Sequence, residues 1–219
     1  MNISQQIASN FLRGTLEDES SENGGSGPTD TILVARAQKG DYKAFDALVT
    51  RHRGKVYAMI VNMIKNDADA WDLAQDAFVK AWKALPKFEN RSQFSTWMFR
   101  ITHNVVYDFT RKRKIKSEGE LDDTMLDATQ IDSSARTAPA ASARPDQVIQ
   151  QQERRAEIEA ALETLSPEHR EVILLREVQG LDYAEIADVM ECSKGTVMSR
   201  IFYARKKLQI LLKPNDDHE

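Results

Sequence analysis

A run of cationic and hydroxyl side chains without a carboxylate lies near the end of the chain. From residue 193 to residue 213 there are six Lys or Arg and no Asp or Glu. Lys and Arg bind phosphates, whereas hydroxyl groups and an aromatic ring can contact base edges. If the segment is a helix at about 100° per residue, these residue types gather on or beside one outward face. The candidate DNA contacts on this face are Ser199, Phe202, Tyr203 and Lys206, with Thr196 and Arg200 beside them, and Lys194 is the first of the six cations.

Two short helices are expected to position that face. Asp182 precedes Glu185 by three residues and opens an apolar-periodic run, which predicts a capping box. Glu191 and Cys192 form the predicted turn, and Ser193 is a suitable N-cap for the second helix. The apolar positions Val197, Ile201, Ala204 and Leu208 recur every three or four residues and predict a buried stripe. The pattern favours a helix-turn-helix over its alternative, a solvated basic helix that packs on a neighbour.

A second group of chemically useful side chains lies between residues 92 and 114. Phe94, Trp97, Met98, Ile101, Val105 and Phe109 predict the buried face of a helix, leaving Thr96, Phe99, Arg100, His103, Tyr107, Arg111 and Lys114 on the opposite face. Exposed rings among cations suit single-stranded nucleic acid, because each stacked base contributes about 1–3 kcal/mol. The alternative is that these aromatic residues pack against another helix.

A third helix is predicted around residues 71 to 85. Its apolar stripe, assigned to the core, consists of Trp71, Ala74, Phe78, Ala81, Trp82 and Leu85. An adjoining face carries polar residues that a core does not require, namely Asp72, Gln75, Asp76 and Lys80. Taken alone, this polar face is equally explained as solvated surface.

Composition and charge predict an all-α protein of two small helical domains. The 219 residues carry a net charge of −4, yet residues 30–114 hold 16 basic and 9 acidic residues and can face a polyanion. We expect a disordered tail over 1–29, domains over 30–114 and 149–213, an acidic flexible linker over 115–148, and a short tail over 214–219. The absence of a long apolar run predicts no membrane insertion, and the scattered His residues and single Cys predict no metal site.

Three motifs in this order resemble the extracytoplasmic function (ECF) group of RNA polymerase sigma factors in the sigma-70 family. The resemblance covers about residues 30–213, and its motifs are DLAQDAFVKAWKAL from Asp72, FENRSQFSTWMFRITHN from Phe88, and LSPEHREVILLREVQGLDYAEIADVMECSKGTVMSRIFYARKKL from Leu165. It implies a sigma region 2 domain and a sigma region 4 domain, which bind core RNA polymerase and the −10 and −35 promoter elements.

The resemblance also implies roles for individual residues. Asp72, Gln75, Asp76 and Phe78 would bind core polymerase. The melted −10 strand would be bound by Lys80, Ala84, Phe88, Phe99, Ile101 and Asn104, with Arg100, His103, Tyr107 and Arg111 beside them. Arg176 would join the candidate contacts of residues 194–206 at the −35 element, where Met198 and Tyr203 stand at positions that relatives often fill with Arg.

The expected protein is a cytoplasmic binding factor rather than an enzyme, and it needs no cofactor. Its melting of promoter DNA would be controlled by an anti-sigma factor, which could hold it at the membrane. Two alternatives remain at this point. One is a helix-turn-helix regulator that binds duplex DNA alone, and the other is a sigma mimic that sequesters an anti-sigma factor.

Overall fold

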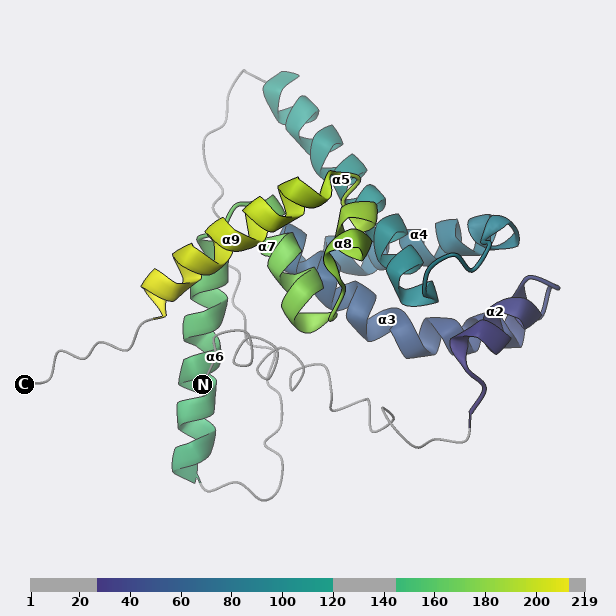
Figure 1. The fold of residues 1–219 in the computed structure, drawn as a ribbon, viewed down its shortest axis with the longest axis horizontal. Helices are drawn as coiled ribbons and strands as arrows, with labels where there is room; N and C mark the ends of the chain where they lie inside the picture. Colours follow the sequence, from purple (N-terminus) through teal and green to yellow (C-terminus); the bar gives the residue numbers. More distant parts are fainter. Residues whose placement is uncertain (1–26, 120–144, 213–219) are drawn as a thin grey trace, which may run out of the picture.

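The computed structural model describes residues 27–119 and 145–212, and every regular element within these ranges is helical (Figure 1). The predicted all-α class is therefore confirmed. The predictions made for residues 1–26, for the acidic linker between residues 120 and 144, and for the end of the chain lie outside the described residues. No helix in the described part is both long enough and apolar enough to span a membrane.

The first helical block contains α2 (Asp30–Ala37), α3 (Tyr42–Ile64), α4 (Asp67–Ala84), the 3-10 turn η2 (Leu85–Lys87) and α5 (Phe94–Gly119). The Asp41 carboxylate accepts hydrogen bonds from the amides of Lys43 and Ala44 and so caps α3, while the Asn66 side chain caps α4. Leu48, Val56, Ile60, Ala77 and Met98 are almost fully buried and form the centre of its core.

The second block contains α6 (Pro145–Glu163), α7 (Pro167–Ile173), the π-helical turn η3 (Leu174–Val178), α8 (Tyr183–Val189) and α9 (Lys194–Leu211). Asp182 and Glu185 form the predicted capping box, and the Ser193 hydroxyl accepts a hydrogen bond from the Thr196 amide. Glu191 has a φ of 49° at the turn between α8 and α9. Val197, Ile201, Ala204 and Leu208 are buried, which confirms the predicted stripe and the helix-turn-helix.

One arginine closes the end of α6. Arg170 lies at the centre of α7, and its guanidinium donates to the carbonyl oxygens of Leu162, Glu163 and Leu165. Carbonyls at a helix C-terminus have no partner within the helix, so a side chain must satisfy them when the end is buried. Arg170 also donates to the carbonyl of Asn62 on α3, at 3.0 Å, and thereby connects the two blocks.

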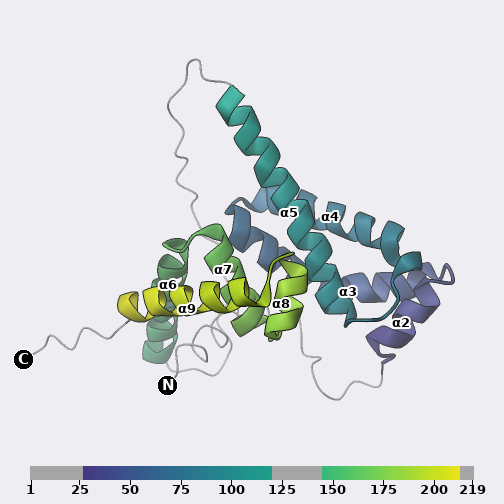
Figure 2. The ribbon, with the colours of Figure 1, turned by 45° about the horizontal axis from the view of Figure 1, so that its top comes forward.

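The two blocks pack against each other along α5. In Figures 1 and 2, α8 and the start of α9 lie beside the amino-terminal half of α5, and the carboxyl-terminal half of α5 projects away from the second block. Met59 of α3 and Phe99 of α5 belong to the same buried cluster as the core of the second block. The structure is therefore a closed arrangement, in which one face of the first block is covered by the second.

Candidate nucleic-acid and partner interfaces

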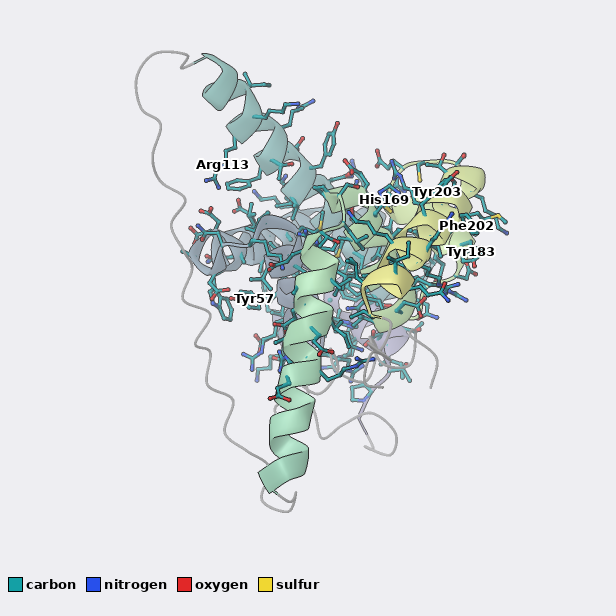
Figure 3. The ribbon with its side chains drawn as sticks, turned by 90° about the vertical axis from the view of Figure 1, so that its left-hand side faces the viewer. Tyr57, Arg113, His169, Tyr183, Phe202 and Tyr203 are labelled. Carbon is teal, nitrogen blue, oxygen red and sulfur yellow. The ribbon has the colours of Figure 1, made fainter. Side chains whose placement is uncertain are left out.

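The outward face of α9 is accessible, as expected for a recognition helix. Phe202 and Tyr203 are 61% and 59% exposed and lie on the outer side of the second block (Figure 3). Lys194, Ser199 and Lys206 are also exposed, whereas Thr196 and Arg200 are half-buried. The structure thus brings the predicted major-groove residues onto one helix with a buried stripe behind it, and this geometry fits a helix that enters a DNA groove.

Cationic groups gather at the amino-terminal end of α9. Arg176 of η3 lies over the Tyr183 ring at 5.1 Å, and its guanidinium donates to the Leu181 carbonyl at 2.7 Å. Arg176, Tyr183 and Lys194 line a shallow hollow of about 240 Å³ together with Asp182 and Ala184. The helix dipole and these two cations attract anions to this end of α9, where the Asp182 carboxylate, whose pKa is lowered by its hydrogen bonds from the Glu185 and Ala184 amides, already supplies one negative charge.

An apolar groove of about 580 Å³ lies between α3 and α4. Tyr42, Trp71 and Val79 are exposed at this groove, although large apolar side chains usually avoid solvent. Asp72 and Gln75 lie at its edge, and Phe78 forms part of its wall. Asp76 is exposed on the same helix. A groove with an apolar floor and a polar rim has the anatomy of a protein-docking surface.

Trp71 was predicted to lie in the core, and this prediction was wrong. The Trp71 side chain is 61% exposed and packs on the Tyr57 ring with a centroid distance of 4.5 Å. It follows the helical period of the buried residues but lies near the amino-terminal end of α4, where the Tyr57 ring covers only part of it. The exposed aromatic residues of the groove, Tyr42 and Trp71, are the surface feature that periodicity alone missed.

The polar and aromatic face of α5 is formed as predicted, but its amino-terminal half is not exposed. Phe99 is only 2% exposed, and Thr96 is 4% exposed and donates to a Glu185 carboxylate oxygen of α8 at 2.9 Å. The prediction that these two side chains face solvent is corrected by the closed arrangement, because the second block covers them. For this half of α5, packing against another helix was the right alternative.

Glu191 accepts hydrogen bonds from two polar groups that were assigned to the −10 strand. Its Oε1 accepts a hydrogen bond from the Asn104 amide at 3.2 Å and one from the Arg100 guanidinium at 3.4 Å. The Asn104 hydrogen bond and the nearby Arg100 charge hold the pKa of Glu191 below its ordinary value. The ionised Glu191 carboxylate thus accepts hydrogen bonds from Asn104 and Arg100, the same donors that a nucleic acid would need.

His103 is also in contact with the second block. Its Nδ1 lies 2.6 Å from Oε1 of Glu171, a residue of α7 that is 3% exposed. Burial lowers the pKa of His103, but the hydrogen bond and charge of Glu171 outweigh it, so the net pKa is raised. Sequence reasoning missed Glu171, whose only signal was its place between the polar start of α7 and the apolar run that begins at Val172.

The remaining candidates for the −10 strand are divided between open and covered positions. Tyr107 and Arg111 are exposed on the projecting half of α5, and Lys80 is exposed on α4. Phe88 is buried, stacked on Trp97 at 4.6 Å. Ala84 and Ile101 are half-buried. Only part of the predicted strand-binding surface is therefore accessible in this arrangement.

Comparison with protein families matches the two blocks separately. The model described as "Sigma-70 region 2" matches residues 48–115, and the model described as "Sigma-70, region 4" matches residues 155–208. The chain is 36% identical over 189 residues to the RNA polymerase sigma-H factor of Pseudomonas aeruginosa, covering 84% of this chain and 94% of that protein. The chain belongs to the sigma-70 family of sigma factors. It is also 36% identical to the ECF RNA polymerase sigma-E factor of Escherichia coli K12, covering 85% of this sigma factor and 95% of that one. These relatives place it in the ECF group.

Two solved structures superpose on this one over most of its length. The sigma factor RpoE from Bartonella quintana, in complex with the anti-sigma factor NepR, aligns with a TM-score of 0.61 at 29% identity, over 79% of this chain and 99% of that one. CnrH, in complex with the cytosolic domain of CnrY, aligns with a TM-score of 0.56 at 29% identity, over 85% and 98% of the two chains. Each alignment covers more of this sigma factor than either helical block holds alone.

Proposed function

We propose that this sigma factor binds core RNA polymerase, directs it to promoters with −35 and −10 elements, and supports strand opening. The observation that carries the proposal is that one chain combines an exposed recognition helix with a second, aromatic and basic helix of the kind that binds single strands. A duplex-binding regulator has no use for the second surface. A mimic that only captures an anti-sigma factor has no use for the cationic end of α9.

The −35 element would be read by α9 in the major groove. Met198, Ser199, Phe202 and Tyr203 present apolar, hydroxyl and aromatic contacts, while Lys194 and Arg176 would bind backbone phosphates. In this assignment, the cations position the helix and the other side chains discriminate between bases. Arg205 is not a candidate contact, because it is paired with Glu177 at 2.5 Å.

Core polymerase would dock in the groove between α3 and α4. Trp71 and Val79 supply exposed apolar area that can be buried in a complex. Polar specificity would come from Asp72 and Gln75 at the groove and from Asp76, which is exposed on the same helix. The bond-forming chemistry would belong to the polymerase, so this protein would act as a binding factor rather than an enzyme.

The −10 strand would be bound by α5 after the second block has moved away. Opening would release Asn104 and Arg100 from Glu191 and uncover Phe99 for contact with an unstacked base. An anti-sigma factor is the expected partner that keeps the blocks closed. This is supported by the structure of the sigma factor RpoE from Bartonella quintana, which was solved in complex with an anti-sigma factor and aligns over 79% of this chain, more than either block holds alone. Such a partner would hold the protein in the cytoplasm, or at the membrane if the partner is itself anchored there.

A charge reversal on α4, next to the groove, tests polymerase docking. Asp76→Arg should weaken the affinity for core polymerase by at least about tenfold, because one lost contact of about 1.4 kcal/mol has that effect. Glu159→Arg, the same reversal at an exposed position of α6, is the matched control and should bind normally. Affinity can be measured by fluorescence anisotropy of labelled protein titrated with core enzyme. Equal affinities for the two variants would refute this docking site.

A second substitution separates docking from strand opening. Asn104→Ala should leave polymerase affinity unchanged but reduce promoter melting, followed by the fluorescence of a base analogue in the −10 element. Tyr107→Leu keeps an apolar side chain but removes the ring on the exposed half of α5, and should also reduce melting. Unchanged melting with both variants would refute the assignment of α5 to the single strand.

A further inference from the structure

The contact between the two blocks contains a buried titratable pair. Within the described residues, the ion pairs that join the blocks are those of Lys65 with Glu163, Arg100 with Glu191, and His103 with Glu171. The first two are largely exposed, so each contributes little to closure. The His103 and Glu171 side chains are only 13% and 4% exposed. Closure therefore places one ionisable ring against one carboxylate with little solvent between them.

Charged groups from every neighbouring element face this ring. Glu171 comes from α7, Glu191 from the turn after α8, and Arg200 from α9. On α5 itself, the Tyr107 ring stacks on the imidazole at 6.2 Å. Glu171 and Glu191 favour the protonated imidazole, and Arg200 opposes it more weakly. The balance of the site thus favours a cationic His103, but only while the second block is in place.

We propose that His103 and Glu171 form a pH-dependent latch, which holds the second block over the −10 face of α5 when His103 is protonated and weakens when the proton is lost. The latch belongs to the chain itself, so it acts on the free protein. The latch itself does not depend on the proposed function. Only its consequence does, namely that promoter-binding groups of α5 become available as the blocks separate.

The direction follows from proton linkage. In the open state, His103 would titrate near its ordinary value of 6.5, because Glu171 would no longer lie beside it. In the closed state, burial lowers the pKa of His103, but Glu171 raises it more, so the net pKa is higher. The stabilisation of closure is therefore fully present below the ordinary pKa and is lost as the pH rises through the raised one. For each unit by which closure raises the pKa of His103, the closed-to-open ratio falls about tenfold in total as the pH passes through the two pKa values.

The latch is testable by fluorescence energy transfer between the blocks in the free full-length protein. Dyes would be placed at Arg91→Cys and Gln209→Cys, two exposed positions in different blocks, with the natural thiol removed by Cys192→Ser. The closed fraction should fall between about pH 6 and about pH 8.5, a range that spans the ordinary histidine pKa. His103→Gln, neutral throughout this range, and Glu171→Gln, of the same shape, should both abolish this dependence.

Two further observations make the outcome decisive. His169→Gln is the matched control, because the His169 ring contacts the hydroxyl of Ser166, the N-cap of its own helix, and not the first block. This variant should keep the pH dependence. Titration of the His103 ring by NMR should give a pKa above 6.5 in the natural chain and a lower one in Glu171→Gln. A closed fraction that ignores pH, or that responds equally in His103→Gln, would overturn the latch. Because no polymerase or promoter is present, this result is independent of the proposed function.

Discussion

Replacing Arg170 by Met should destabilise the second block more than any surface substitution. Arg170 is 8% exposed, and four carbonyl oxygens accept hydrogen bonds from it. Its bonds to Glu163 and Asn62 are only partly buried, so water can replace the guanidinium there. The Leu162 carbonyl keeps a second hydrogen bond, from the Leu165 amide at 3.1 Å. Of the four carbonyl oxygens that accept from Arg170, the one of Leu165 would be left buried without a partner.

The expected decrease in the free energy of unfolding follows from what happens to these four carbonyl acceptors. A buried acceptor left without a partner costs about 1–3 kcal/mol, and the loss of one of two bonds at Leu162 adds about 1 kcal/mol. The Met side chain fills most of the volume of the Arg stem, so no large cavity term is added. We therefore expect the free energy of unfolding of the second block to fall by about 2–4 kcal/mol, which is a large share of the about 5–15 kcal/mol that stabilises a typical domain.

Two spectroscopic signals report on different parts of the chain in urea unfolding. All three tryptophans, Trp71, Trp82 and Trp97, are in the first block, so their fluorescence follows that block, whereas circular dichroism follows the helices of both. Arg170→Met should move the dichroism transition to lower urea more than the fluorescence transition. Arg155→Met removes an exposed pair with Glu159 on α6 and should cost less than about 0.5 kcal/mol. A loss below about 1 kcal/mol for Arg170→Met would refute the role of the buried guanidinium.

Three other predictions concern separate features. Asp182→Ala removes the capping box of α8 and should lower the unfolding free energy by about 1 kcal/mol in thermal melts; no change would mean that the cap is not stabilising. Tyr203→Arg should steepen the salt dependence of −35 duplex binding, measured by anisotropy, by about 0.9 in the log–log slope, and an unchanged slope would place residue 203 away from the phosphates. Burial raises the pKa of Asp30, but His52 and Arg51 lower it more, to a net value below 3.8, so this carboxylate stabilises the fold at neutral pH and ceases to do so as the pH falls through the lowered pKa. Asp30→Asn should therefore reduce the melting temperature at neutral pH but not below that pKa; an equal reduction in both would contradict it.

The sequence was a good guide to local structure because the local signals are strong. Asp182, Glu185 and Ser193 define the helix starts by hydrogen bonds that span only a few residues, and the structure forms them as predicted. The buried stripe of α9 follows equally directly from the helical period. These features depend on near neighbours in the chain, so no knowledge of the tertiary arrangement is needed to predict them.

The sequence was a poor guide to the contact between the blocks. Phe99 and Tyr107 lie on one face of α5 and look alike in the pattern, yet Phe99 is buried under the second block and Tyr107 is 57% exposed. Their difference depends on where α8 ends along α5, and no local periodicity encodes that position. The Glu171 and Glu191 contacts were missed for the same reason, since each joins residues separated by more than sixty positions. The assignment of Trp71 to the core failed because periodicity does not tell which face of α4 lacks a neighbour.

Transcription in vitro from a genomic promoter library, with core RNA polymerase and with or without this protein, tests the central claim most directly. The proposed function predicts new start sites that appear only with the protein and share two spaced upstream elements. It also predicts that, at limiting protein concentration, Asp76→Arg greatly reduces the transcripts from these sites whereas Glu159→Arg retains them. The absence of any protein-dependent start site, with polymerase binding demonstrated in the same preparation, would contradict the claim that this chain directs promoter recognition.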